Sequence, residues 1–267
     1  MKPRRPPPDS RSRSPWRWAV GGAAVGAVGA VLVFAPASWL AAGLAQASAE
    51  RVRLLDPRGT VWQGSGLLQL TGGAGSRDVA VLPGRVQWHL QPRWSGLAAT
   101  LRADCCTPEP LRLDLALQPR GAVLGVDGGG NSDWPAALLA GLGAPWNTLQ
   151  LDGRLVLRTE GLRLHWAAGR LELDGAAELL ARDVASALSP LKPLGSYRLR
   201  VEGGATPTLS LQTVEGALQL SGAGRWVGQR LHFQGEARAA PEREAALSNL
   251  LNLLGRRNGP RSLISLG

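Results

Sequence analysis

The sequence predicts a mainly β protein, in which an N-terminal transmembrane helix precedes an antiparallel meander of short strands. The meander is expected to form a curved sheet with a few short covering helices. Two patterns predict this fold class. One long stretch near the N-terminus is apolar and uncharged, and the rest of the chain alternates apolar and polar residues with the period of a strand. The 35 Gly and 19 Pro among 267 residues also interrupt the chain too often for long helices.

The N-terminal 17 residues form a basic segment rich in Pro, Arg and Ser, which offers little apolar surface to bury and predicts a disordered tail. No charged residue occurs from Trp18 to Ala49. A helix over Trp18–Leu40 alone would be about 34 Å long, enough to cross the ~30 Å hydrocarbon core. We therefore place a transmembrane anchor at residues 18–45. The arginine cluster on its N-terminal side keeps residues 1–17 in the cytoplasm and exports residues 46–267.

Within the anchor, the two ends and one face carry candidate residues. The indole rings of Trp18 and Trp39 would lie at the level of the lipid headgroups. Small residues recur at four-residue spacing at Gly22, Gly26 and Ala30, which would let a second helix approach closely.

Two further features qualify the anchor. Pro36 is expected to kink or end its helix near the outer edge. A cleaved signal peptide is the alternative interpretation, because Ala45-Gln46-Ala47 has the form of a cleavage site. The apolar stretch is about twice as long as the apolar region of a signal peptide, which favours a retained anchor, and both interpretations export the rest of the chain.

After Glu50 the alternation predicts a series of short strands that pair in sequence order. Segments 149–158 and 162–168 are expected to form a hairpin about a tight turn at Glu160-Gly161, with a third strand near Leu171–Leu173. The other predicted strands are Thr60–Leu70, Gly84–Leu90, Gly96–Arg102, Leu111–Leu117, Tyr197–Glu202, Thr208–Thr213, Ala217–Gly222 and Arg230–Ala237.

Three segments predict short helices: one through Leu142 that begins near Ser132, one over Ala176–Leu188, and one over Pro241–Leu254. The last is amphipathic, with Pro at its start and Gly255 after its end. We expect residues 46–267 to form one β-rich domain, with a division into two lobes near 121–148 as the alternative.

The sequence contains none of the common catalytic, nucleotide-binding or metal-binding motifs, so we expect no enzymatic activity and no catalytic, cofactor or metal site. His89, His165 and His232 lie singly in different alternating segments, without a second donor nearby in sequence. The chain carries 30 basic and 20 acidic residues, but much of the excess lies in the N-terminal tail. A nucleic-acid partner is therefore not expected.

The adjacent residues Cys105 and Cys106 leave three interpretations open. They form a strained vicinal disulfide, remain two protected thiols, or bridge to another molecule. Neither a helix N-terminus nor a histidine that would stabilise a thiolate is evident beside them, which argues against a catalytic redox pair.

The exported part resembles type II secretion system protein N. The resemblance is carried by the stretch Gly59–Gly66 with Val86–Pro92, by Leu188–Tyr197, and by Leu211–Gly224 with Phe233–Ala237 and Leu247–Arg257. The motif positions are Gly59, Thr60, Trp62, Gly64, Trp88, Pro92, Pro193, Gly195, Tyr197, Thr213, Gly216, Leu218, Gly222, Phe233 and Gly235.

This resemblance implies an accessory component of the type II secretion apparatus in the bacterial inner membrane, with its main domain in the periplasm. Its implied partners are the other inner-membrane and periplasmic components of the apparatus, with membrane lipid contacted through the anchor. Exposed strand edges would offer such partners a site for β-augmentation.

A periplasmic lipid-binding or lipid-transfer protein with an apolar β-trough is the alternative function. A trough needs a continuous apolar lining along successive strands. Charged residues at alternate positions of Leu155–Arg158 and Arg198–Glu202 favour the secretion component.

Overall fold

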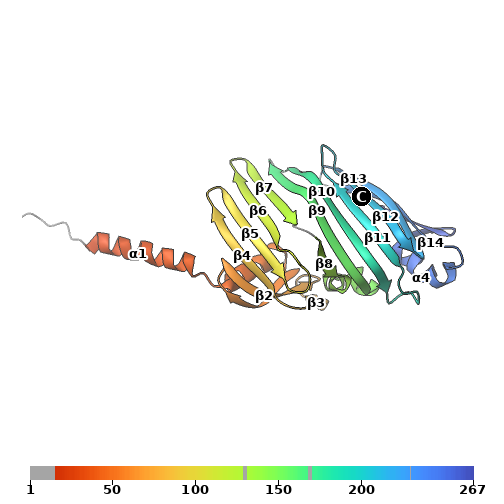
Figure 1. Cartoon of the computed structure of the whole chain (residues 1–267), viewed down its shortest axis with the longest axis horizontal. Helices are drawn as coiled ribbons and strands as arrows, with labels where there is room; N and C mark the ends of the chain where they lie inside the picture. The colour runs from red at the N-terminus through yellow and green to blue at the C-terminus, as the bar shows by residue number, and fades with distance from the viewer. Residues whose placement is uncertain (1–15, 129–130, 168–169, 229) are drawn as a thin grey trace, which may run out of the picture. The chain divides into compact units, whose positions relative to one another are not determined.

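The structure is a computed structural model that describes residues 16–128, 131–167, 170–228 and 230–267. The chain divides into two compact units, one that ends at Ala35 and one that spans Pro36–Gly267. The helices of the described residues are α1 (Trp16–Val33), α2 (Ala37–Ala47), the 3-10 helix η1 (Ala136–Leu142), α3 (Trp146–Leu149) and α4 (Glu244–Leu254) (Figure 1).

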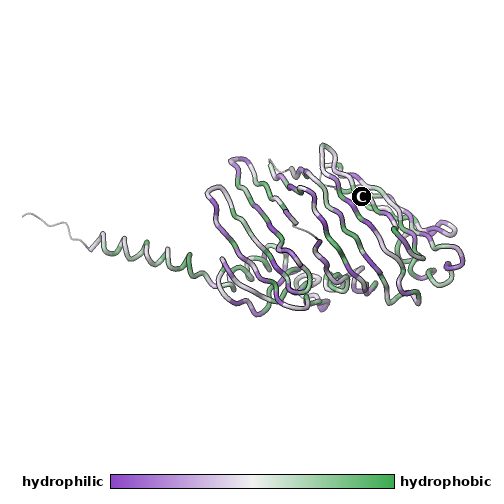
Figure 2. Tube along the Cα trace, viewed as in Figure 1, coloured by the Kyte–Doolittle hydropathy of each residue, from purple (hydrophilic) through white to green (hydrophobic). Residues whose placement is uncertain are grey.

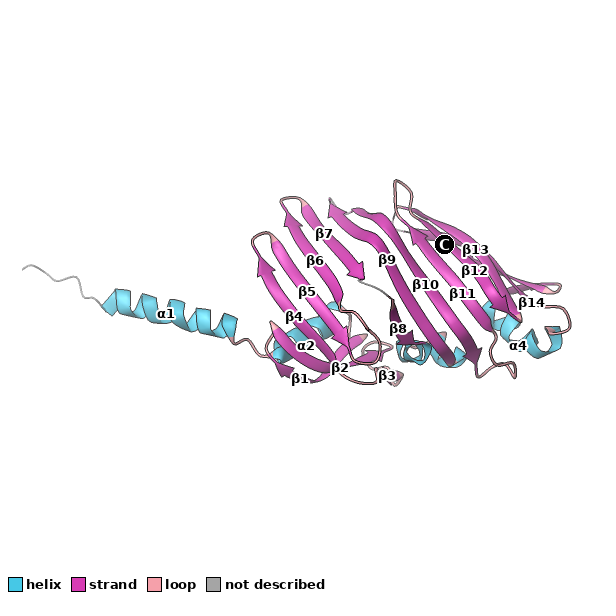
Figure 3. Ribbon diagram, in the orientation of Figure 1, coloured by secondary structure: helices cyan, strands magenta, loops and turns pink. Residues whose placement is uncertain are grey.

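One antiparallel sheet dominates the second unit, as the meander predicts (Figure 3). Its strands follow one another in sequence order from β1 to β14, except that short β3 pairs with β2 and short β8 pairs with β9. The strands are β1 (Val52–Gly59), β2 (Gln63–Thr71), β3 (Val79–Val81), β4 (Val86–Arg93), β5 (Gly96–Ala103), β6 (Leu111–Gln118), β7 (Gly121–Gly128), β8 (Ser132–Pro135), β9 (Leu151–Ala167), β10 (Arg170–Ser186), β11 (Gly195–Glu202), β12 (Thr208–Gly216), β13 (Leu218–Val227), β14 (Arg230–Ala239), β15 (Arg256–Asn258) and β16 (Arg261–Leu266).

The stretch 18–45 contains two helices in separate units, with the break at Pro36 that the sequence predicts. Helix α1 ends at Val33, and Pro36 precedes the first residue of α2 in an extended conformation, as expected for a residue that cannot continue a helix. Pro36 also forms a β-bridge with Thr60. Among the described residues, no helix combines the length and the apolar character that crossing a bilayer requires.

The expected hairpin about Glu160-Gly161 is wrong, because this segment is a single strand of 17 residues, β9. Gly161 (φ +58°) lies opposite Gly175 (φ +80°) of β10, and the pairing of the two strands shifts register there. The two glycines therefore form an irregularity inside a long strand pair, which sequence alone does not distinguish from a turn.

The expected helix over Ala176–Leu188 is also wrong, because Ala176–Ser186 lies in β10. Strand β10 has a hydrogen-bonded neighbour on each side, β9 and β11, and this pairing outweighs the helix propensity of its Ala, Leu and Glu residues. The expected helix over Pro241–Leu254 is confirmed as α4, and the segment before Leu142 contains η1. Strands β1 and β7 had not been expected.

The helices of the second unit lie along one end of the sheet (Figure 1). At this end, the chain passes from β7 to β9 through β8, η1 and α3, and from β14 to β15 through α4. At the opposite end, which we call the open end, β4–β5 and β6–β7 are joined by tight turns at residues 94–95 and 119–120. The alternation of apolar and polar residues is visible along the strands in Figure 2.

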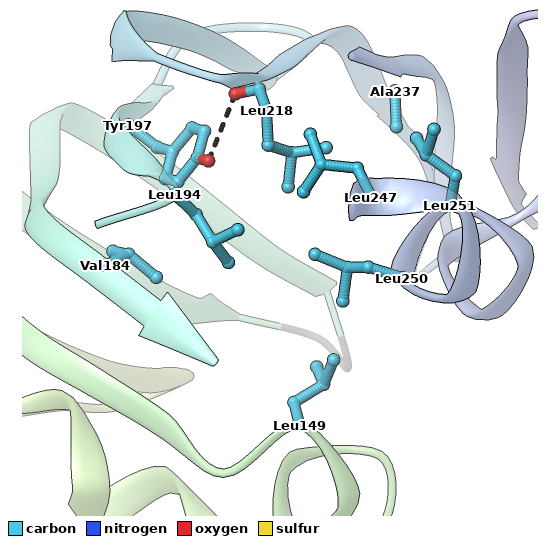
Figure 4. Close-up of a cluster of buried hydrophobic side chains, with 9 residues drawn as sticks. All are labelled: Leu149, Val184, Leu194, Tyr197, Leu218, Ala237, Leu247, Leu250 and Leu251. Carbon is cyan, nitrogen blue, oxygen red and sulfur yellow. Dashed lines mark hydrogen bonds between the residues drawn. The ribbon is translucent and has the colours of Figure 1, made fainter. Parts of the chain in front are cut away.

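Two apolar clusters form the core near the helix-bearing end. One contains Leu247, Leu250 and Leu251 of α4 packed against β10–β14 (Figure 4). The other contains Leu82, Cys106 and Leu138 and lies near β2, β4 and η1. Burying side chains of this kind is the main driving force for folding.

Both edges of the sheet carry features that discourage strand addition. Edge strand β1 contains Pro57 and an irregular register between Leu55 and Arg58. At the other edge, β15 has three residues, all exposed, of which two are arginines. These features weigh against the β-augmentation expected from the resemblance.

Candidate interaction site

The first group of motif residues forms and clamps the turn between β1 and β2. The Thr60 amide donates to the carbonyl of Gln63 at 2.9 Å, and the Gln63 amide donates to Thr60 Oγ1 at 3.1 Å. Trp88 of β4 donates its indole Nε1–H to the carbonyl of Val61 at 3.0 Å. Gly59 (φ +89°) closes the turn, and a Cβ at this position would lie 2.5 Å from the Gln63 carbonyl oxygen.

Gly64 and Trp88 are directly paired across β2 and β4. Trp88 is buried, and a Cβ on Gly64 would lie 2.5 Å from Cζ2 of the indole ring. The glycine thus leaves the space that the ring fills. The Leu90 amide donates to the Trp62 carbonyl at 2.6 Å. Pro92 lies on β4 beyond the residues that pair with β2, so its missing amide hydrogen removes no hydrogen bond to β2.

Beside this clamp lies a polar hollow of about 630 Å³. We call it the arginine hollow, because Arg58, Arg85 and Arg102 line it together with His89 and Asp104. Its remaining lining residues are Gly59, Gln63, Gly64, Ser65, Gln87, Trp88, Thr100 and Pro110.

The side chain of Arg85 is held in place by several hydrogen bonds. It donates from Nη1 to the Asp56 carboxylate at 2.9 Å and from Nε to Ser65 Oγ at 3.1 Å. The same carboxylate lies 2.8 Å from Nη2 of Arg58. The neighbouring guanidinium groups of Arg85 and Arg58 hold the pKa of the exposed Asp56 carboxyl below its ordinary value.

The charges of the arginine hollow do not cancel. Three arginines face two aspartates, Asp56 and Asp104, which leaves one net positive charge when His89 is neutral. Gln87 donates to Asp104 Oδ1 at 3.3 Å. The hollow therefore offers a net cationic surface of guanidinium groups that suits a carboxylate or another anionic group of a partner.

A second group of motif residues is brought together in β11–β14, within the core. Tyr197 is buried and donates its hydroxyl to the Leu218 carbonyl at 3.1 Å (Figure 4). Gly195 pairs with Gly216, and a side chain on either would collide with the other strand. The Leu220 amide donates to Thr213 Oγ1, and Pro193 lies in the loop before β11, next to buried Leu194.

Phe233 completes this group. Its ring lies against Gly222 and Gly235, where a Cβ would overlap it. Phe233 is buried, and its neighbour across the pair with β13 is Gly224. This second group packs the sheet and forms no open site of its own.

The expected anchor residues lie in two different helices. Trp18, Gly22, Gly26 and Ala30 belong to α1, and Trp39 belongs to α2. In α1, a Cβ added at Gly22 or Gly26 would meet nothing within 4 Å.

The remaining residues of chemical interest are dispersed. His89 lines the arginine hollow, His165 Nε2 lies 3.1 Å from a carboxylate oxygen of Asp174, and His232 is exposed on β14. Cys105 and Cys106 form a disulfide with each other, the first of the three interpretations above.

Sequence patterns alone did not identify the arginine hollow. Gln87 and His89 alternate with apolar residues, so they share the polar face of β4, but Arg58 and Arg102 come from other strands. Only the pairing of β1, β2, β4 and β5 brings them together.

Comparison with protein families gives a match that covers most of the chain. The model of the family described as type II secretion system (T2SS), protein N, matches residues 50–263, well over half of the chain. Comparison with curated proteins gave no significant match. Comparison with solved structures gave none either.

Proposed function

Since the chain belongs to the type II secretion system protein N family, we propose that it is an accessory inner-membrane component of that apparatus, which exports folded proteins across the outer membrane. The family match over residues 50–263 carries this proposal, because it spans the sheet and both groups of motif residues. The proposed role is non-catalytic and consists of contacts with other components of the apparatus.

In this proposal, residues 1–17 lie in the cytoplasm, 18–45 anchor the chain in the inner membrane, and 46–267 lie in the periplasm. The absence of charge from Trp18 to Ala49 supports the anchor. The exposed apolar side chains of α1, among them Trp18, Val25 and Val28, also support it. The Cys105–Cys106 disulfide fits an oxidising compartment.

The partner contact that we propose is the arginine hollow. Its arginines come from β1, from β5 and from the residue before β4, and Arg85 is fixed by Asp56 and Ser65, so little entropy of this side chain is lost when a partner binds. A cationic surface of this kind favours an acidic segment of another secretion component and speeds its association. The protected edges of the sheet make strand addition the weaker alternative.

Site-specific photo-crosslinking in the native host tests this proposal. A photoreactive residue replaces Gln87, which lines the hollow, in the full-length chain. The matched control replaces Gln91, which is exposed on the same face of the same strand as Gln87 but does not line the hollow. We expect a crosslink to another secretion component from position 87 and none from position 91.

Two results would contradict the proposal. Equal crosslinking from both positions would show that the hollow is not the site of partner contact. Crosslinks that contain no secretion component, in cells that are actively secreting, would overturn the proposed role itself.

A further inference from the structure

A row of five leucines crosses the middle of the sheet on one face. Direct cross-strand pairs join Leu97 of β5 to Leu115, Leu115 to Leu124, Leu124 to Leu164, and Leu164 to Leu173 of β10. Paired residues of an antiparallel sheet place their side chains on the same face. We call this set the leucine row.

The leucine row is only half-buried. All five side chains retain intermediate exposure. The helices pack elsewhere: α2 against β1 and β2, η1 against β2, β3 and β9, and α4 against β14 to β16. An apolar surface of this kind, left open to solvent, indicates a binding site.

The opposite face of the same strands is charged. Asp114 of β6 lies across from Gly125, which pairs with Arg163 of β9, and Arg163 pairs with Asp174 of β10. The leucine row therefore belongs to a two-faced sheet, of which one face is polar and hydrated. The other needs an apolar occupant.

The length of the row suits an acyl chain. Five strands at about 4.8 Å spacing span about 19 Å. The hydrocarbon of one leaflet is about 15 Å deep, half of the ~30 Å core. The row presents aliphatic carbon without a polar anchor, whereas protein partners are usually held by aromatic or arginine anchors in pockets and by hydrogen bonds.

The open end next to the row combines an arginine with exposed apolar residues. Trp94 is fully exposed in the β4–β5 turn, and Leu117 and Trp166 are 61% and 63% exposed near the ends of β6 and β9. Arg120 lies in the β6–β7 turn and is exposed. Arg93 belongs to the opposite face, because its neighbour Pro92 pairs with Leu97, and its guanidinium lies 3.8 Å from Asp114.

This combination is complementary to a phospholipid. Indole rings favour the boundary between lipid headgroups and hydrocarbon, and guanidinium groups bind phosphate in a bidentate manner. We propose that the leucine row binds an acyl chain of an anionic glycerophospholipid whose phosphate contacts Arg120 at the open end. This inference stands independently of the proposed role in secretion.

Photo-labelling tests it with a defined probe, phosphatidylglycerol that carries a diazirine on one acyl chain. The full-length chain in mild detergent is mixed with the probe, irradiated and digested, and the labelled peptides are identified by mass spectrometry. We expect label on β6, β7 and β9. Label confined to the apolar helix α1 would overturn the proposal, and this readout needs no variant.

Substitutions on β7 provide a matched pair. Leu124→Gln places an amide in the leucine row, and Val123→Gln places one on the opposite face of the same strand. We expect Leu124→Gln to lower labelling of the sheet about fivefold and Val123→Gln to leave it unchanged. Equal labelling of both variants, with their melting temperatures matched, would contradict the proposal.

The headgroup and the source of the lipid are tested separately. Arg120→Ala should weaken labelling by the phosphatidylglycerol probe more than labelling by a phosphatidylcholine probe, whereas Arg93→Ala, on the opposite face, should not. Displacement of the probe by unlabelled lipopolysaccharide but not by phosphatidylglycerol would overturn the assignment to a glycerophospholipid. A photoreactive residue at Leu115 that captures a protein in cells, and no lipid, would assign the row to a protein partner instead.

Discussion

At the scale of single residues, Tyr197 shows how a motif position stabilises the sheet. Its ring packs in the core beside Leu194 and Leu218, and its hydroxyl satisfies a carbonyl at 3.1 Å. Burial raises the pKa of this phenol above its ordinary value of 10.0, because the charged form would lose its hydration. A raised pKa in the folded state adds stability that is present below pH 10 and lost as pH rises further.

Tyr197→Phe should therefore change both stability and its pH dependence. At neutral pH the variant should lose about 1–3 kcal/mol of unfolding free energy, because the buried Leu218 carbonyl has no donor. Above pH 10 the wild type should lose stability more steeply than the variant. Denaturant titrations of the full-length protein in detergent at neutral and alkaline pH measure both effects.

The absorbance of tyrosinate provides a direct control, because the chain contains one tyrosine. In the wild type the signal should appear only together with unfolding. A tyrosinate signal near pH 10 in a protein that is still folded would show that the phenol is not protected.

At the scale of elements, α4 shows an amphipathic pattern that predicts structure correctly. Leu247, Leu250 and Leu251 are buried against the last strands of the sheet, whereas Leu253 is half-exposed at 48%. Because α4 supplies three of the buried leucines of this cluster, the cluster depends on α4.

Leu251→Ala should lower the unfolding free energy by about 2–5 kcal/mol, since it leaves a cavity in the core. The control Leu253→Ala, on the same helix, should change it by less than about 0.5 kcal/mol. Thermal unfolding of the two full-length variants in detergent measures the difference. Equal effects would mean that α4 does not pack as described.

Strand β10 shows the opposite outcome. In the segment Ala176–Leu188, most of which lies in β10, Leu180, Val184 and Leu188 recur every four residues, which predicts a helix. The segment pairs instead with β9 and β11, and its ladder hydrogen bonds decide its structure. The same pairing explains β9, in which Glu160-Gly161 has the composition of a turn but lies inside a strand.

At the scale of the whole molecule, the sheet is continuous from the apolar cluster that contains Leu138 to the one that contains Leu251. Strand β7 pairs with β6 on one side and with β9 on the other, so the region 121–148 connects the two halves rather than ending the sheet. Residues Pro36–Gly267 accordingly form one compact unit.

This continuity predicts coupled unfolding. Leu138→Ala and Leu251→Ala each change one of the two apolar clusters. Each substitution should accelerate hydrogen exchange of the slowest amides in both β4–β6 and β11–β13. Hydrogen exchange with mass spectrometry on full-length variants measures this. Acceleration confined to the half that carries the substitution would show that the two halves unfold separately.

The candidate site was less predictable than the fold. The motif positions Gly64 and Trp88 stand out in the sequence, and the structure brings them into contact. Arg58, Arg85 and Arg102 do not stand out, because isolated arginines at polar positions of strands are ordinary in sequence. Their convergence depends on strand register, which one sequence specifies only through its neighbours in space.

The sequence by itself determined what depends on local chemistry: the uncharged N-terminal stretch, the alternation that makes a sheet, the break at Pro36 and the helix α4. Tertiary structure alone decided what depends on which strands pair. It joined two expected strands into β9, made a strand of a helical pattern, and aligned five leucines from five strands on one open face. The physical reason is that hydrophobic period and helix-ending residues are local features of the chain, whereas strand register and the order of neighbouring strands depend on the whole chain.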